Sequence, residues 1–213
     1  MTPRIARRER RREASREEIV DAARRVLLRR GIVSTTLDAV AEEVGLTKAA
    51  IYYYFPSKDA LLFELIFGIY ARNAQAVHDG VERAADGPAA LRAVIRETLK
   101  GYAPNLDDFR LAFLHNQVAV AGGVTIAAEQ FERIRPLNDL AYSGAAAKLA
   151  EDWKAAPGRA DVDPRLMTFL ANMAAVGLLT MKGMVEHVGD PLRYSDDELV
   201  EGLSRIFEAA ARP

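Results

Sequence analysis

The chain has 213 residues, of which half are hydrophobic, and it contains no cysteine and carries a formal net charge of −1. This length and apolar content allow a sizeable buried core and exclude general disorder, while the lack of cysteine excludes a disulfide framework and cysteine-based zinc sites. The N-terminal run MTPRIARRERRREAS lacks the apolar core of a secretory signal, so we expect a cytoplasmic protein.

The charge is distributed unevenly along the chain. Residues 1–60 contain 13 Lys/Arg against 9 Asp/Glu, whereas the remainder contains 16 against 21. Seven of the basic residues are arginines at or before Arg16. A basic front predicts an anionic partner there, although a solvated charged tail accounts for the charge equally well. We expect residues 1–12 to form a basic flexible arm.

Helical periodicity dominates the chain and strand alternation is nearly absent, so the predicted fold class is all-α. The first predicted helix starts at Ser15, which forms a capping box with Glu18, and ends at Gly31. Its apolar residues then fall on one face, and they are Ile19, Ala23, Val26 and Leu27.

Two short helices follow. Thr36 can cap the first of them, and Gly45 supplies the left-handed geometry that ends it. Thr47 can cap the second, which must end at Phe55 because Pro56 disfavours helical geometry in the residue before it.

Ser57 can cap a fourth helix that runs to about residue 78. After the break DGPAA, apolar periodicity predicts further helices at roughly 88–102, 106–121, 124–155, 164–188 and 196–211. Pro136 should start, end or kink a helix. We therefore predict about nine helices. They form an N-terminal three-helix domain at 13–73, joined to a larger helical domain at 74–213.

Residues 36–55 have the geometry of a helix-turn-helix, in which the second helix lies in the DNA major groove and the first braces it. The small Ala41 allows the two helices to cross closely, and Ile51 anchors the second one. This motif, behind a basic N-terminus, predicts a DNA-binding domain.

The three consecutive tyrosines at 52–54 cannot share a face, because successive helical residues are about 100° apart. Ile51 and Phe55, four residues apart, should face inward. Two outward rows result, made of Lys48 with Tyr52 and of Ala49 with Tyr53. A phenol can donate to a phosphate oxygen, and the lysine can reach a phosphate or a guanine edge. The alternative is a surface aromatic pair packed on a neighbouring helix.

The run TTLDAVAEEVGLTKAAIYYYFPSKDALL, within residues 19–62, resembles the DNA-binding domain of TetR-family transcriptional regulators. The most specific string comprises Thr36, Gly45, Thr47, Lys48, Tyr52, Phe55, Ser57 and Lys58. The resemblance covers about a quarter of the chain. It implies a homodimer whose helical second domain binds an effector and dimerises through its last two long helices, near 164–188 and 196–211.

The resemblance also implies roles for single residues. DNA-backbone contacts would come from Thr36, Thr47, Tyr52, Tyr53 and Lys58, and the residues facing the groove would be Lys48 and Ala49. The chain departs from the family pattern in two places. It has Ala49-Ala50 where many members have Gly-Thr, and tyrosine where many have a histidine. Base recognition in relatives therefore does not transfer to this sequence.

The helix near 164–188 mixes large apolar residues with Ala and Gly, which permit close helix approach. Together with the last helix it could form a four-helix dimer interface, and the alternative is an ordinary monomeric core. Polar residues interrupt apolar helices in LAFLHNQVAV and at Asn172. A small-molecule pocket is usually lined by apolar groups with a few polar groups among them, so these residues indicate such a pocket. The predicted contacts of a small apolar or amphipathic effector are Phe113, His115, Asn116, Tyr142, Asn172 and Met173. A satisfied structural histidine is the commoner role for His115.

No metal, cofactor or catalytic group is predicted, because the three histidines lack metal-ligand spacing and no nucleophile elbow or phosphate-cradling glycine loop occurs. The apolar segment 166–181 is shorter than the roughly 20 residues that span a bilayer, so no membrane partner is expected. The leading hypothesis is a ligand-responsive repressor on a near-palindromic DNA operator. Its alternatives are a helical protein-interaction module and a helical enzyme.

Overall fold

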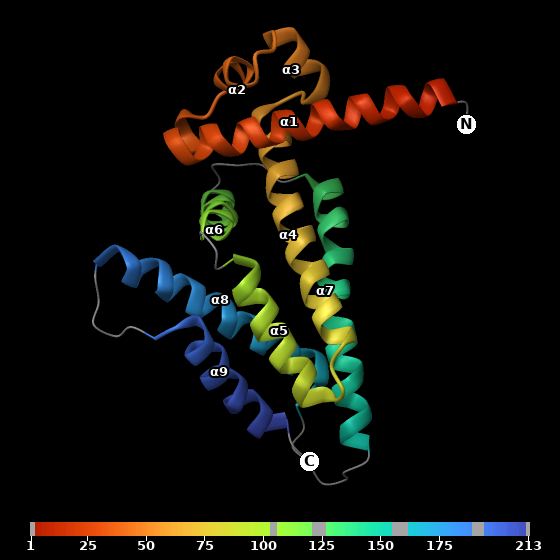
Figure 1. The fold of residues 1–213 in the computed structure, drawn as a ribbon, viewed down its shortest axis with the longest axis vertical. Coiled ribbons are helices and arrows are strands. Elements are labelled where there is room, and N and C mark those ends of the chain that lie inside the picture. Colours follow the sequence, from red (N-terminus) through yellow and green to blue (C-terminus); the bar gives the residue numbers. More distant parts are fainter. Residues whose placement is uncertain (1–2, 103–105, 121–126, 155–161, 189–193, 212–213) are drawn as a thin grey trace. The chain divides into compact units, whose positions relative to one another are not determined.

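A computed structural model describes the chain except for residues 1–2, 103–105, 121–126, 155–161, 189–193 and 212–213. The described residues form nine helices and no strand, which confirms the all-α prediction (Figure 1). The helices are α1 (Pro3–Ser34), α2 (Leu37–Val44), α3 (Lys48–Tyr54), α4 (Lys58–Glu82), α5 (Gly87–Tyr102), α6 (Asp107–Val120), α7 (Ala128–Lys154), α8 (Pro164–Val188) and α9 (Asp196–Ala211).

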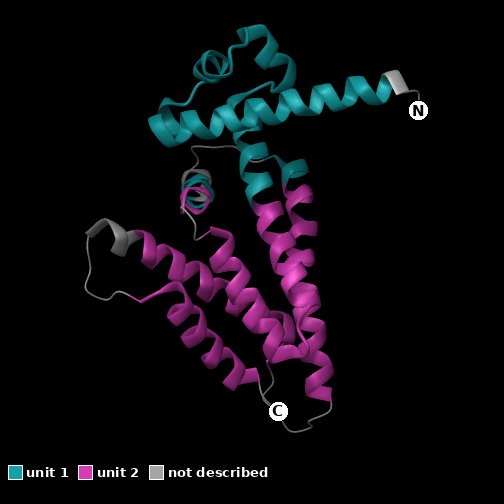
Figure 2. Ribbon diagram, viewed as in Figure 1, with its two compact units in different colours: residues 1–69, 111–130 teal, residues 70–110, 131–213 magenta. Residues whose placement is uncertain are grey.

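The chain divides into two compact units (Figure 2). The first comprises residues 1–69 and 111–130, and the second comprises residues 70–110 and 131–213. We expected a single boundary after residue 73, whereas residues 111–130 group with the first unit. Each unit has an apolar core of its own.

Helix α1 begins at Pro3, well before the predicted start at Ser15. Residues 3–12, which we expected to form a flexible arm, are helical in the structure. Arginine, glutamate and alanine, which make up most of this segment, are among the best helix formers, and proline is favoured at a first helical position. Gly31, with φ 73° and ψ 168°, breaks α1 at the predicted place, and the chain makes only one further turn to Ser34.

The two short helices have the predicted bounds and caps. Thr36 is extended and its hydroxyl accepts from the Ala39 amide, while Gly45 ends α2 with φ 71° and ψ 28°. A Cβ atom at Gly45 would meet nothing within 4 Å, so the backbone angle and not the available space calls for glycine there. The core beneath these helices joins α1, α2, α3 and the start of α4, and its largest fully buried members include Ile19, Ile51, Phe55 and Leu61.

In the second unit, α5 is the central helix and packs against both α8 and α9. Its N-terminal half also packs with α4 and α7 in an apolar cluster that contains Val77, Val94 and Ala145. Pro136 lies inside α7, which neither begins nor ends there. The Trp153 indole of α7 donates to the carbonyl of Ala211, 3.0 Å away, and so ties the end of α9 to α7.

Helix α8 has two apolar faces. One is buried and includes Ala171, Ala175 and Leu179. The opposite face is a continuous exposed stripe, here called the α8 stripe, which consists of Leu166, Leu170, Met173, Gly177 and Met181. The span Pro164–Gly183 has 20 residues and a mean hydropathy of 1.3, so it is long and apolar enough to cross a membrane, contrary to the length argument made from the sequence. A helix that packs against another protein surface can have the same length and composition.

Candidate nucleic-acid interface

The two sides of α3 differ as the sequence predicts. Ile51 is fully buried and Phe55, just after the helix, is 1% exposed. On the other side, Tyr52 is 47% exposed and Tyr53 is 63% exposed. Tyr54 is partly buried against the core of the first unit, and its ring meets that of Tyr53 edge to face at 5.1 Å. Helix α3 therefore presents two phenols outward while its aliphatic side is fixed in the core.

The caps add hydroxyl groups at the helix ends. Thr36 and Thr47 are both exposed, and each hydroxyl oxygen accepts a backbone N–H, from Ala39 at 3.1 Å and from Ala50 at 3.2 Å. Because each oxygen acts as an acceptor in its cap, its O–H remains able to donate outward. A phosphate oxygen is a suitable acceptor for such a donor.

Lys48 lies in the first turn of α3, exposed beside Ala49, and its ammonium donates to the Asp38 carboxylate of α2 at 2.8 Å. This hydrogen bond raises the pKa of Lys48 above its ordinary value. Both side chains are more than half exposed, so the ion pair contributes little to stability and can exchange for another anion. A DNA phosphate could therefore replace Asp38 as the partner of the Lys48 ammonium.

Lys58 is held differently from the other predicted DNA contacts. Its ammonium donates to the backbone carbonyls of Ile32 and Val33, in the turn that follows the Gly31 break. These bonds satisfy two carbonyls at the end of α1, where a helix leaves such groups without internal partners. In this structure Lys58 joins the start of α4 to the end of α1.

An ionic brace that the sequence analysis missed joins α1 to α2. Arg25 donates to Glu43 at 2.9 Å, and Arg29 forms a bidentate pair with the same carboxylate. The hydrogen bonds from Arg29 and then Arg25 hold the pKa of Glu43 at about 2, below its ordinary value. The residues are 14 and 18 positions apart, so no local sequence pattern could have indicated the brace.

Two of the predicted effector contacts meet in the second unit. Asn172 of α8 accepts from the Thr98 hydroxyl of α5 at 3.0 Å and donates to the Tyr142 hydroxyl of α7 at 2.9 Å. Thr98 and Asn172 are buried, and burial raises the pKa of Tyr142. The polar group that interrupts the apolar run of α8 is thus part of a hydrogen-bonded trio that links three helices, in which Thr98 and Asn172 are buried and Tyr142 is partly buried.

The other predicted effector contacts are dispersed. Phe113, which is exposed, and His115, which is buried, belong to the first unit. The side chain of Asn116 lies outside the described residues. Met173 belongs to the exposed α8 stripe, on the side of α8 that faces away from its buried residues.

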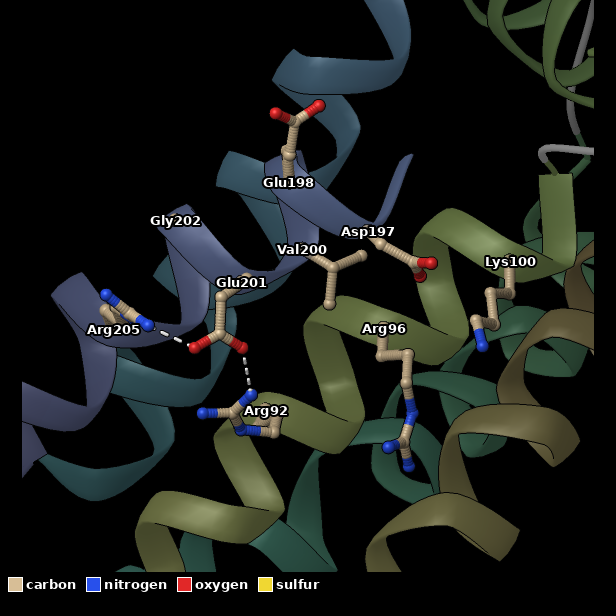
Figure 3. A pocket seen from close by; sticks show the side chains of 9 residues that line it. All are labelled: Arg92, Arg96, Lys100, Asp197, Glu198, Val200, Glu201, Gly202 and Arg205. Atoms are coloured by element: carbon tan, nitrogen blue, oxygen red, sulfur yellow. Dashed lines mark hydrogen bonds and ion pairs between the residues drawn. The ribbon is translucent and has the colours of Figure 1, made fainter. Parts of the chain in front are cut away.

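A surface groove of about 770 Å³ runs between α5 and α9 in the second unit (Figure 3). Arg92 donates to both Glu201 and Glu208 at 2.5 Å, and Arg205 donates to Glu201 at 2.8 Å. These bonds, from Arg205 and then Arg92, lower the pKa of Glu201. None of the predicted effector contacts lines this groove, and its mixed, paired charges differ from the apolar pocket that the sequence analysis expected.

No group of three or more His, Asp or Glu side chains in the described part of the chain could hold a metal ion.

Short capped helices, a glycine turn and an outward polar face define the class of helix-turn-helix DNA-binding proteins. The sequence profile described as "Bacterial regulatory proteins, tetR family" matches residues 19–65. The chain is similar to the HTH-type transcriptional regulator TtgR of Pseudomonas putida, with 34% identity over 74 residues, 35% of this chain and 33% of TtgR. It thus spans about a third of the length of this curated relative.

Similar solved structures cover the chain more fully. A transcriptional regulator of the TetR/AcrR family from Thermobifida fusca aligns over 94% of this chain and 100% of its own, with 25% identity and a TM-score of 0.69. FadR from Bacillus subtilis, solved in complex with stearoyl-CoA, aligns over 92% and 96%, with 18% identity and a TM-score of 0.64. Residues 19–65 thus match the DNA-binding domain of tetR-family bacterial regulatory proteins, and the chain is similar in fold to solved regulators of the TetR/AcrR family.

Proposed function

We propose that the protein is a homodimeric transcriptional repressor that binds a near-palindromic operator and leaves it when a small apolar or amphipathic effector binds the second unit. The observation that carries the proposal is the division of α3 into a fully buried side and an outward side with Lys48, Tyr52 and Tyr53. A helix fixed by its inner face can present its outer face to DNA without reorganisation, and two such helices in a dimer would lie about 34 Å apart in successive major grooves.

Features of the second unit support the proposed dimerisation and effector binding. The α8 stripe is apolar and exposed in a single chain, and exposed contiguous apolar surface marks sites of association. The Thr98–Asn172–Tyr142 trio, of which Thr98 and Asn172 are buried, supplies neutral hydrogen-bonding groups in an apolar setting. FadR of similar fold was solved with stearoyl-CoA, an amphipathic molecule. These features support a small apolar or amphipathic molecule as the effector.

Release from DNA requires the effector to prefer one of two dimer conformations. Helix α4 begins in the first unit and ends in the second, and we propose that it transmits this difference to α3. For a 100-fold loss of operator affinity, the free energies of effector binding to the two conformations must differ by about 2.7 kcal/mol.

The test is selection of a binding site from random double-stranded DNA by the full chain. We expect enrichment of a two-fold-symmetric site, and the variants Lys48→Ala and Tyr53→Ala should each bind it roughly 10-fold more weakly while retaining helix content and dimerisation. Enrichment of no symmetric site by the wild-type protein would favour a protein-interaction module. Unchanged affinity of both variants would assign the outward tyrosines to packing.

A further inference from the structure

The N-terminal part of α1 is a basic helix that extends the first unit. Among its described side chains, residues 7–12 include five arginines and one glutamate, and all six are exposed. Glu9 lies three residues before Arg12, and Glu13 lies three before Arg16, a spacing at which opposite charges stabilise a helix. The arginines therefore have places fixed by the helix, which a flexible arm would not give them.

One row of these arginines lies on the side of α1 that faces α3. Arg16 forms an ion pair with Glu64 of α4 at 3.0 Å, and its guanidinium lies 5.1 Å from the centre of the Phe55 ring. One turn earlier, the guanidinium of Arg12 lies 5.7 Å from the centre of the Tyr53 ring. Arg8 is the next member of this i, i+4, i+8 row and is exposed.

The row leads from the core to the outward face of the recognition helix. Tyr53 is one of the two exposed phenols of α3, so Arg12 lies at the edge of the surface that would face DNA. A guanidinium has five N–H donors, and contact of its face with an aromatic ring leaves these donors available to phosphate oxygens.

We propose that Arg8 and Arg12 bind DNA phosphates beside the groove that α3 enters, as fixed members of the α1 helix. The inference rests on the proposed operator binding and adds a second contact surface to it. The shape of the segment limits where it can bind. A helix with its side chains is about 10–12 Å across, whereas the minor groove of B-DNA is about 6 Å wide, so a helical extension lies along the phosphates and does not enter that groove.

The same helix supplies a matched control. Arg7 and Arg10 are exposed as well, but they lie on the opposite side of α1 from the row that contacts Tyr53 and Phe55. A flexible arm would use arginines from both sides alike, because its backbone could turn either set toward DNA. A fixed helix uses only the row beside α3.

The experiment compares Arg8→Gln/Arg12→Gln with Arg7→Gln/Arg10→Gln, two double variants that lose equal charge. Operator affinity of the full chain is measured as a function of salt concentration. Each phosphate contact contributes about 0.9 to the slope of log affinity against log salt, so the first variant should lower the slope by about 1.8 per bound subunit. When salt rises from about 50 to 200 mM, the operator affinity of this variant should therefore fall by a factor roughly 12-fold smaller per subunit than that of the wild type. The second variant should keep at least most of the wild-type slope and affinity.

A third variant, Ala14→Pro, tests the helix without removing charge. Proline at 14 disfavours helical geometry at Glu13, and the capping box of Ser15 with Glu18 lets the rest of α1 start at Ser15. The extension is then detached with all its arginines present. We expect an affinity loss close to that of Arg8→Gln/Arg12→Gln. Circular dichroism and dimer mass show whether each variant remains folded.

The outcomes separate this inference from the proposed function. If the wild-type chain binds an operator but both double variants lose affinity equally, or if Ala14→Pro binds like wild type, the fixed-helix inference is wrong and operator binding stands. If neither double variant changes the affinity or the slope, the extension makes no contact with DNA. If the wild-type chain selects no operator, the proposed function and this inference both fail.

Discussion

Helices α3 and α8 each bury one side and expose the other, but their exposed sides differ in chemistry. The outer side of α3 carries an ammonium and two phenols, whereas that of α8 carries aliphatic and thioether groups around an open Gly177. Side chains with hydrogen-bonding ends are stably hydrated when no partner is bound, and they suit a charged, hydrated partner. An aliphatic stripe is stabilised only when its surface is removed from water by contact with another apolar surface. The chemistry of the exposed side therefore indicates the kind of partner for each helix.

The largest effect should come from the buried side of α3. Ile51→Ala removes a fully buried side chain from the core of the first unit and should reduce its free energy of unfolding by about 2–5 kcal/mol, with loss of DNA binding. Tyr52→Ala, on the outer side of the same helix, should change it by less than about 0.5 kcal/mol. Urea titrations followed by circular dichroism measure both. Equal destabilisation by the two substitutions would contradict the division of α3 into an inner and an outer side.

The next effect concerns the α8 stripe. Leu170→Glu would place an unpaired carboxylate in the proposed dimer interface and should raise the dimer dissociation constant roughly 100-fold or more. Ala147→Glu, which puts the same charge on an exposed position of α7, serves as the control and should leave the dimer intact. Analytical ultracentrifugation gives both constants. A Leu170→Glu protein as dimeric as wild type would place the interface elsewhere.

The smallest effect concerns the brace that holds α2, and with it α3, against α1. The pKa of Glu43 is depressed to about 2 by Arg29 and Arg25, so its contribution to stability is present above its ordinary value of 4.5 and disappears as the pH falls through about 2. Glu43→Gln should lower the melting temperature slightly at neutral pH, and the difference from wild type should vanish toward about pH 2. The exposed Glu42→Gln is the control. A difference that persists at that acidic pH would mean that the ion pair is not its source.

The sequence predicted the helix-turn-helix closely because its determinants are local. Thr36, Gly45 and Thr47 act within a few residues of themselves, and helical spacing alone separates Ile51 from its outward neighbours. The DNA contacts proposed for these residues stay predictions.

The errors have the opposite origin. The capping box at Ser15 is a valid local signal, but good helix formers on its N-terminal side continue the helix through it. The carbonyl partners of Lys58 and the arginine partners of Glu43 are distant in sequence, and only the folded chain brings them together. The hydrogen-bonded trio is intermediate. The sequence indicated Tyr142 and Asn172 as polar residues of interest, but it could not show that they bind each other.

The contact between Lys58 and the end of α1 makes the helix-turn-helix a closed loop. The ammonium and the Ile32 carbonyl are 26 residues apart in sequence, and both short helices lie between them. Closing this loop at its base costs conformational entropy once, and that single closure constrains both α2 and α3. The two helices should therefore open and exchange their amide protons as one cooperative segment, without the separate fraying expected of helices only 8 and 7 residues long.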